Sequence, residues 1–452
     1  MTSPTTQIAF RNNTGSSTAY AYVTGRDINR GSAYAFMRPD GKTMYYPTSP
    51  PQPQSPLAID PSIPLGPPGT TTTVTIPQLA GGRIWFSVGA KLTFLLNPGN
   101  PGPGIVEPAV TNKSDLNYNI KHEAWIMPSY DNQQQLFVNI SYVDFVSLPI
   151  ALDLLNTAGK VQSVKGLPVN GLDQICAQLT QQGAVENPGW AKLVVKGPDG
   201  KNLRALSPNS GHVVDNTLFQ GYYQPYVDQA WAKYTSTDLH IDTQAQWGVV
   251  TGRVDSKTNL LTFNTTSSSA AGTVASAGSF AKPSAGDIFS CSTGPFGNYP
   301  LATRDVQGAI GARLAAALNR STLLANPNQP TPSSSGSSGK TYYYQLSPTN
   351  HYARIVHGVN LDGRGYAFPY DDVAASGDNG PDQAGTVFDG SPRLLTVTVG
   401  GPAPSSNSAR AVGGKKDVEK GREEKKNKGL SFPAVFLKRM MSALRGIFHK
   451  SK

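Results

Sequence analysis

Two acidic side chains lie close together in a part of the sequence that holds few other charges. Glu123 stands in the segment HEAWI (residues 122–126), and Asp144 stands in NISYVDFVSLP (residues 139–149). Both segments are rich in β-branched and aromatic residues, a pattern that predicts two adjacent strands. Two carboxyl groups that face one groove can serve as general acid and general base in the hydrolysis of a glycosidic bond. The pair is therefore the first candidate for a catalytic site.

The first 150 residues have the pattern of a β domain. Short runs of Val, Ile, Phe, Tyr, Trp and Thr alternate with clusters of Pro, Gly and Asn, which predicts a sandwich or barrel of short antiparallel strands. The chain has 46 Gly and 36 Pro among 452 residues, and only 15% of its residues are charged, against roughly 25% in an average soluble protein. This composition indicates strands and loops more than helices.

Residues 151–340 predict a mixed α/β domain. Leu172, Ile175, Cys176 and Leu179 follow the i, i+3, i+4, i+7 spacing of one helix face. Asp305 is a candidate N-cap for a second helix with the same period. Strand-like runs lie between the predicted helices.

From residue 341 to residue 402 the β pattern returns, and these residues are predicted to form strands that close the first β domain. The fold class is therefore predicted as mainly β with an α/β insert. Four segments carry this prediction: TYYYQLS (residues 341–347), YARIVHGV (352–359), GYAFPYDDV (365–373) and LLTVTVGG (394–401).

The last 50 residues, 403–452, form a basic tail. They hold 13 of the 39 Lys and Arg residues but only 4 of the 29 Asp and Glu residues, so the tail supplies nearly all of the net charge of +10. The rest of the chain is close to neutral, and we predict no nucleic-acid partner. Residues 415–428 mix both charges and are predicted to be disordered, whereas residues 437–448 have one apolar and one basic helical face. Such a helix suits an anionic membrane surface or a calmodulin-like groove, or it packs back on the protein.

Several separated motifs resemble glycoside hydrolase family 64, the laminaripentaose-producing β-1,3-glucanases. The resemblance covers roughly residues 7–400 and implies a thaumatin-like β-barrel or sandwich domain beside a mixed α/β domain, with a wide groove between them. It also implies an inverting endo-type hydrolase that releases oligosaccharides from laminarin-like β-1,3-glucan. We expect a monomer without a cofactor. The motifs stand in the family's order: GRIWFSVG (residues 82–89), GIVEPAVTN (104–112), NISYVDFV (139–146), ALNRSTLL (317–324) and GYAFPYDDV (365–373).

The resemblance implies a role for each carboxyl group of the pair. Asp144 matches the family aspartate that serves as general base, and its structural alternative is a strand-end residue that caps a turn. Glu123 is the candidate general acid, but its separation of 21 positions from Asp144 is longer than the family pattern. Pro128 stands where an ungapped alignment places the glutamate. Either an enlarged hairpin has left Glu123 in place, or the acid is lost and the protein binds β-glucan without cleaving it.

Further side chains are candidates for contact with the sugar. Each has a structural alternative: packing for the residues on the strands, and turn or backbone hydrogen bonds for the two adjacent aspartates. The predicted substrate-binding residues are Trp125, Asn139, Ser141, Tyr142, Glu107, Asp371 and Asp372.

The sequence predicts no metal site, because His351 and His357 are six positions apart and no Cys/His set has the spacing of zinc ligands. Cys176 lies on the apolar face of a predicted helix and is expected in the protein core. A disulfide between Cys176 and Cys291 is the alternative. The first residues show no basic region followed by an apolar stretch, so we expect an intracellular protein or secretion by another route. The resembled family, in contrast, is typically extracellular.

Overall fold

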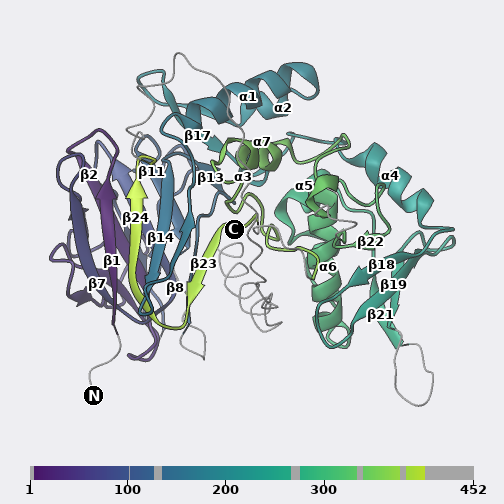
Figure 1. The fold of residues 1–452 in the computed structure, drawn as a ribbon, viewed down its shortest axis with the longest axis horizontal. Helices are drawn as coiled ribbons and strands as arrows, with labels where there is room; N and C mark the ends of the chain where they lie inside the picture. The colour runs from purple at the N-terminus through teal and green to yellow at the C-terminus, as the bar shows by residue number, and fades with distance from the viewer. Residues whose placement is uncertain are drawn as a thin grey trace, which may run out of the picture.

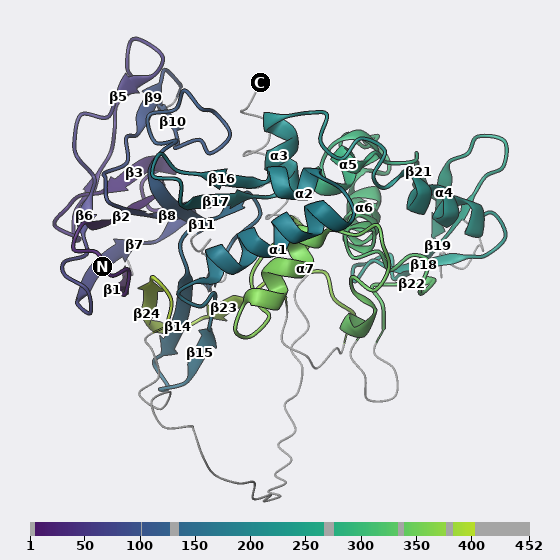
Figure 2. The same ribbon diagram turned by 90° about the horizontal axis from the view of Figure 1, so that it is seen from above.

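Two β-sheets and a helix-rich α/β part make up the molecule in the computed structural model (Figure 1). The sheets that hold the N-terminal strands lie at one end, the helix α6 and its sheet lie at the other, and α7 lies between them (Figures 1 and 2). The structure describes residues 5–100, 102–126, 135–265, 275–332, 339–376 and 383–402.

The first sheet has five strands, and the chain enters it at three separate places in the sequence. Strand β24, near the end of the described chain, pairs in parallel with β1 and antiparallel with β14, so it lies between them. Strand β7 buries Val74 and Ile76 while Thr73 and Thr75, which alternate with them, stay more exposed, as expected for a strand with one covered face. In spatial order the strands are β15 (Val161–Val164), β14 (Ile150–Asn156), β24 (Pro392–Val399), β1 (Thr5–Asn12) and β7 (Thr71–Pro77).

The second sheet packs against the first through aromatic and aliphatic side chains. Phe10 of the first sheet meets Phe86 of the second edge to face, with ring centroids 5.4 Å apart. The path of this sheet is β11 (Lys121–Ile126), β8 (Leu79–Val88), β2 (Ala19–Asp27), β3 (Ala33–Met37) and β4 (Met44–Tyr45), with β6 (Ile63–Pro64) beside β2. Strand β11 is therefore an edge strand, and it carries Glu123.

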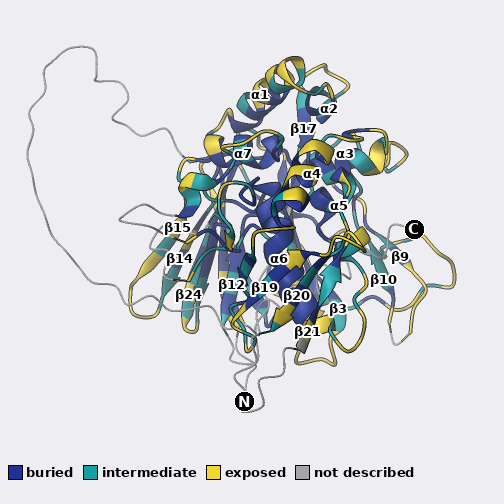
Figure 3. Cartoon of the chain, turned by 90° about the vertical axis from the view of Figure 1, so that its right-hand side faces the viewer, coloured by how far each residue is buried: buried dark blue, intermediate teal, exposed yellow. Residues whose placement is uncertain are grey.

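The α/β part is built around helix α6 (Arg304–Asn319), which is buried on all sides from Val306 onward. Figure 3 shows α6 as a buried element inside a more exposed shell. Its sheet runs in the order β21 (Ala275–Phe280), β20 (Leu261–Thr265), β19 (Val249–Val254), β18 (Leu239–Asp242) and β22 (Asn328–Gln329). The other helices are α1 (Gly171–Val185), α2 (Gly189–Lys192), α3 (Pro208–Val214), α4 (Gln224–Lys233), α5 (Ala285–Ser290) and α7 (His351–Val359), with 3-10 turns η1 (Gly294–Phe296) and η2 (Gly339–Tyr342).

Three small sheets complete the described structure. The sheet most relevant to the site joins the segment after Asp144 to the α/β part, because β13 pairs with β17. The small sheets are β10 (Gly104–Val106), β9 (Leu95–Asn97) and β5 (Ser55–Pro56); β12 (Leu136–Asn139) and β23 (Thr386–Asp389); and β13 (Phe145–Val146), β17 (Asn202–Leu206) and β16 (Val194–Lys196).

The structure differs from the sequence prediction at several points. Strands β14 and β15 belong to the sheet of β1, so the β region extends beyond residue 150. Of the four segments predicted as closing strands, only LLTVTVGG forms one, as part of β24. TYYYQLS and GYAFPYDDV consist of turns, with a 3-10 turn in the first and an isolated bridge in the second. YARIVHGV is helix α7, because its β-branched residues also follow a helical period and Asn350 caps the helix by accepting a hydrogen bond from the Ala353 amide. Asp305 lies inside α6, whose N-cap is Thr303.

Further findings concern the cysteines and the tail. Cys176 and Cys291 are both buried free thiols. Among the described residues, none of the helices is long and apolar enough to cross a membrane. The predicted disordered segment and the amphipathic helix of the tail lie outside the described residues.

Candidate active site

Asp144 lies at a bend immediately before β13 and is half-buried. Its backbone carbonyl accepts a hydrogen bond of 2.9 Å from the Ser207 amide, at the end of β17. The β13–β17 pairing continues directly after it, with Phe145 opposite Leu206. The backbone of Asp144 is thus fixed by a strand of the neighbouring part of the molecule, while its side chain keeps partial access to solvent.

The environment of the Asp144 carboxyl group acts on its pKa in two directions. Burial raises the pKa above its usual value, and the positive charge of Arg83 on β8 opposes that increase. Arg83 also forms an ion pair with Glu107, with 3.2 Å between Nη1 and Oε2. Glu107, a predicted sugar contact, is therefore the partner of the cation that faces Asp144, and about a third of its side chain remains exposed.

Glu123 lies deeper than a sugar-contacting acid is expected to lie. Its exposed fraction is 1%. Its Oε2 accepts hydrogen bonds from the amides of Ser147 (2.6 Å) and Leu148 (3.1 Å), which follow Asp144 in the chain. Two N–H donors on one carboxylate oxygen stabilise its negative charge and orient the group. The structure thus brings Glu123 to the segment that carries Asp144 but places it in the interior.

The predicted sugar contacts on β11, β12 and the following segment have different positions. The Trp125 side chain lies outside the described residues. Asn139 is largely buried on β12, and within the described part of the chain its Oδ1 has no hydrogen-bond partner. Ser141 is half-buried and pairs with Tyr366 in an isolated bridge. Tyr142 has no exposed surface and belongs to the main hydrophobic core, so in this conformation its ring has no face for a sugar.

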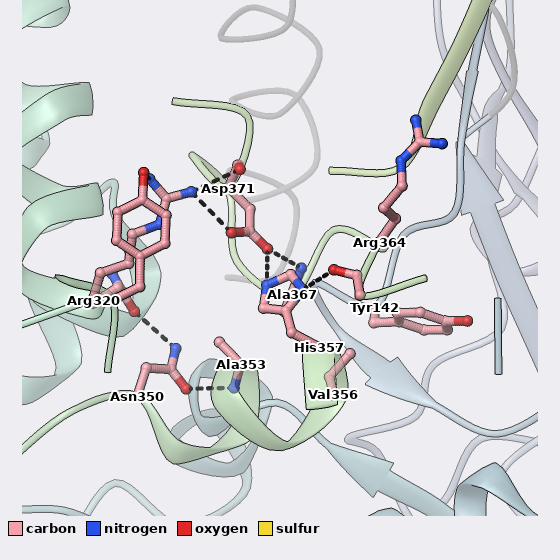
Figure 4. Close-up of polar contacts among 12 residues, drawn as sticks. Tyr142, Arg320, Asn350, Ala353, Val356, His357, Arg364, Ala367 and Asp371 are labelled. Carbon is pink, nitrogen blue, oxygen red and sulfur yellow. Dashed lines mark hydrogen bonds and ion pairs between the residues drawn. The ribbon is translucent and has the colours of Figure 1, made fainter. Parts of the chain in front are cut away.

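The two adjacent aspartates, Asp371 and Asp372, have different roles. Asp371 is fully buried, and its carboxylate contacts Nη2 of Arg320 at 3.1 Å and Nε2 of His357 at 2.8 Å (Figure 4). It also accepts a hydrogen bond from the Ala367 amide at 2.9 Å. Asp371 therefore has a structural role, and the prediction that it contacts sugar is wrong. Its carboxylate links Arg320 at the end of α6, His357 of α7 and the loop that carries Asp371.

Asp372 points into a different environment. It is half-buried, and burial raises the pKa of its carboxyl group to about 6, although a hydrogen bond from the Tyr366 side chain and the charge of Arg313 oppose the increase. Arg313 on α6 is buried and donates from Nη2 to Oε1 of Gln244 at 2.9 Å. Within the described residues, neither Oδ1 of Asp372 nor Nε of Arg313 has a hydrogen-bond partner. Such a pair of unsatisfied groups is typical of a site that receives a polar ligand or water.

Two residues near Asp144 were not predicted from the sequence. Arg83 belongs to the motif GRIWFSVG, and its charge in an otherwise weakly charged segment was a usable signal. Tyr352 of α7 donates a hydrogen bond to the carbonyl of Tyr142, which lies 210 positions earlier. A contact across that separation leaves no local pattern in the sequence.

The family profile and the similar proteins of known name indicate the same family. The sequence profile of glycoside hydrolase family 64, described as β-1,3-glucanase, matches residues 4–399. Two proteins named glucan endo-1,3-β-glucosidase are similar over 330 residues: that of Cellulosimicrobium cellulans is 31% identical and that of Arthrobacter sp. (strain YCWD3) is 32% identical. These alignments cover 72% of this chain and 53% of each relative. The chain thus spans about half the length of the curated relatives it matches.

Solved structures show the same relationship. The fold matches a laminaripentaose-producing β-1,3-glucanase in complex with laminaritetraose, with a TM-score of 0.72 and 33% identity, over 87% of this chain and 98% of that chain. A β-1,3-glucanase domain from Clostridium beijerinckii has a TM-score of 0.64 at 19% identity over the same shares, a likeness of fold alone. The chain belongs to glycoside hydrolase family 64, the β-1,3-glucanases.

Proposed function

We propose that this protein is an endo-type hydrolase of β-1,3-glucan that works with inversion, with Asp144 as general base and Glu123 as general acid. The observation that carries the proposal is the match to a laminaripentaose-producing enzyme over 98% of that chain, at 33% identity. Asp144 supports it further, because it is half-buried at a fixed bend and the charge of Arg83 opposes the rise that burial causes in its pKa.

In this mechanism Asp144 takes a proton from water while the water oxygen attacks the anomeric carbon of a glucose unit. Glu123 gives a proton to the glycosidic oxygen as the bond from that oxygen to the anomeric carbon breaks. The products are two shorter chains, and the new reducing end has the α configuration because attack comes from the face opposite the leaving group. The two carboxyl groups must then be roughly 6.5–9.5 Å apart, to leave room for the water.

Glu123 imposes a specific requirement on this proposal. A general acid must be protonated, whereas the Ser147 and Leu148 amides that donate to Oε2 favour the ionised carboxylate. Glu123 is only 1% exposed, which favours the second candidate function: glucan binding without hydrolysis, with Glu123 as a structural hydrogen-bond acceptor. The two candidates differ in whether the glycosidic oxygen reaches a protonated Glu123 carboxyl group.

We further propose that the glucan lies in a groove between a thaumatin-like β domain and the α/β domain. Asn139, Ser141, Glu107 and Asp372 would contact glucose hydroxyl groups, and Trp125 would stack on a ring. In this proposal the protein acts as a monomer. Size-exclusion chromatography with light scattering, with and without laminarin oligosaccharides, tests this last point.

The decisive experiment is incubation of the purified protein with laminarin, followed by NMR of the first products. The proposal expects oligosaccharides whose new reducing ends appear first as the α anomer. Binding of laminarin without new reducing ends would establish the binding function instead, and β anomers would exclude inversion.

A second measurement tests the acid directly. Glu123→Gln keeps an oxygen that can accept the two amide hydrogen bonds, but its amide has no acidic proton to give to the leaving group. We expect this variant to lose laminarin hydrolysis and to retain turnover of a dinitrophenyl β-1,3-glucoside, whose leaving group needs no acid. Equal loss on both substrates would show that Glu123 does not act as the acid.

A further inference from the structure

Helix α7 reaches the segment that carries Asp144 through one tyrosine. The Tyr352 ring is completely buried, and its hydroxyl donates a hydrogen bond of 2.6 Å to the carbonyl of Tyr142. Tyr142 is two residues before Asp144, so this contact fixes a peptide group at the base of the bend. The donor, Tyr352, lies 210 positions later in the sequence and belongs to helix α7.

The preceding peptide group, between Ser141 and Tyr142, is held as well. The Tyr142 amide donates to the Tyr366 carbonyl at 2.6 Å, and the Tyr142 ring packs so closely on Gly365 that a Cβ there would lie 2.7 Å from a ring carbon. After the bend, the Ser207 amide donates to the Asp144 carbonyl. The backbone at the bend is therefore held by defined partners before and after Asp144, and it sets the position from which the Asp144 side chain projects.

Helix α7 is held at both ends by side-chain contacts. Asn350 caps it, and His357 near its other end contacts Asp371 at 2.8 Å. Desolvation first, and then the negative charges of Glu123 and Asp144, raise the pKa of Tyr352 well above its usual value. The phenol therefore remains a hydrogen-bond donor throughout the pH range in which the protein is folded.

We propose that Tyr352 is a positioning residue for the general base, which fixes the bend at Asp144 from helix α7. This inference rests on the proposed function of Asp144. Tyr352 does not touch the substrate and acts only through the Tyr142 peptide. Its loss lets that peptide rotate, and a small displacement of a catalytic group lowers the rate by on the order of 10- to 100-fold.

The test is Tyr352→Phe, with Tyr234→Phe as the matched control. Tyr234 is equally buried, and its hydroxyl donates to the Leu323 carbonyl at 2.5 Å in the α/β part. Each variant removes one buried tyrosine-to-carbonyl hydrogen bond, so both should lower the melting temperature. Only Tyr352→Phe should lower kcat on laminarin, with KM unchanged and the acidic limb of the pH–rate profile displaced.

A readout that needs no hydrolysis separates this inference from the proposed function. The ¹³C carboxyl signal of Asp144, assigned by its absence in Asp144→Asn, is titrated in the wild type and in both tyrosine variants. We expect the Asp144 pKa to change in Tyr352→Phe and to stay constant in Tyr234→Phe. Identical titrations in all three proteins, or equal loss of kcat in both variants, would overturn the inference, whereas an inactive wild type would overturn only the proposed function.

Discussion

At Asp144, burial and a nearby cation act in opposite directions on one carboxyl group. A general base must be ionised at the working pH and must still be basic enough to take a proton from water. Burial raises the pKa and so increases basicity, while Arg83 keeps the charged form accessible. The Glu107 carboxylate pairs with the Arg83 guanidinium, with 3.2 Å between Oε2 and Nη1. Arg83 thus carries a paired charge that still lowers the pKa of Asp144.

The first prediction concerns the charge of Asp144. Asp144→Asn keeps the size of the side chain but cannot accept a proton from water, so we expect kcat on laminarin to fall by ~10²-fold or more. Binding of laminarin oligosaccharides, measured by calorimetry, should persist. Near-normal kcat in this variant would remove Asp144 from the catalytic role.

The second prediction concerns Asp372, whose pKa of about 6 lies above the ordinary value of 3.8. The raised pKa therefore costs the folded protein free energy that grows as the pH rises from about 4 to about 6 and is complete above about pH 6. The cost is absent well below pH 4, where the group is protonated in both the folded and the unfolded state. Asp372→Asn should raise the free energy of unfolding at pH 8 by about 1–3 kcal/mol, after allowance for partial exposure.

Urea unfolding at several pH values between 4 and 8 checks this prediction. The gain should grow between pH 4 and pH 6 and then level off. A gain that does not depend on pH would show that the carboxyl group is not strained by burial. Retention of a destabilising aspartate is the pattern expected of a residue kept for ligand contact.

At the scale of elements, the loop of residues 366–376 links the two parts of the molecule. Tyr366 pairs with Ser141 on the β side, and Arg320 at the end of α6 donates to the carbonyls of Asp371 and Val373. The Arg320 guanidinium also lies over the Tyr343 ring at 4.3 Å. Asp371 is the anion that makes the burial of this cation possible (Figure 4).

The third prediction follows from that ion pair. Burial alone would raise the pKa of Asp371, but the charges of His357 and Arg320 hold it below its usual value. Asp371→Asn leaves Arg320 buried without its counter-ion, so we expect a loss of about 3–5 kcal/mol in the free energy of unfolding at pH 7.

Denaturant unfolding of Asp371→Asn beside Asp372→Asn gives a direct comparison of neighbours. We expect opposite signs at neutral pH, with the stabilising contribution of Asp371 declining as the pH falls below about 4. Equal effects of the two substitutions would contradict the separation of the two roles.

At the scale of the whole molecule, the charge is distributed unevenly along the sequence. Residues 403–452 carry 13 basic and 4 acidic side chains, while the rest of the chain is nearly neutral. The family match ends at residue 399, just before this tail. We therefore expect the tail to act independently of catalysis.

The fourth prediction is that the tail binds anionic membranes. Each basic residue near such a surface contributes ~1 kcal/mol, and salt weakens the attraction. The full chain should sediment with phosphatidylserine vesicles at low salt, and a version ending at Gly401 should not, although both hydrolyse laminarin equally. Equal vesicle binding by both versions, or loss of activity on truncation, would show that the tail is not a separable anchor.

Local sequence was sufficient for those features that depend on periodicity and motif. The apolar spacing of Leu172, Ile175, Cys176 and Leu179 predicted the buried face of α1 because a helix repeats every 3.6 residues wherever it lies. The ordered motifs, Asp144 among them, were sufficient for the family. Local patterns failed at α7, where β-branched residues fit both a strand and a helix, and packing decided between them.

Only the tertiary structure decided which carboxyl groups are exposed and what surrounds them. Asp371 and Asp372 are adjacent and chemically identical in the sequence, yet one neutralises a buried cation and the other remains half-exposed with a raised pKa. Glu123 stood on the predicted strand, but its burial depends on the segment of Ser147 and Leu148 that covers it. Tyr352 reaches Tyr142 across 210 positions. Burial, charge pairing and long-range hydrogen bonds depend on which elements pack together, and no local pattern in the chain contains that information.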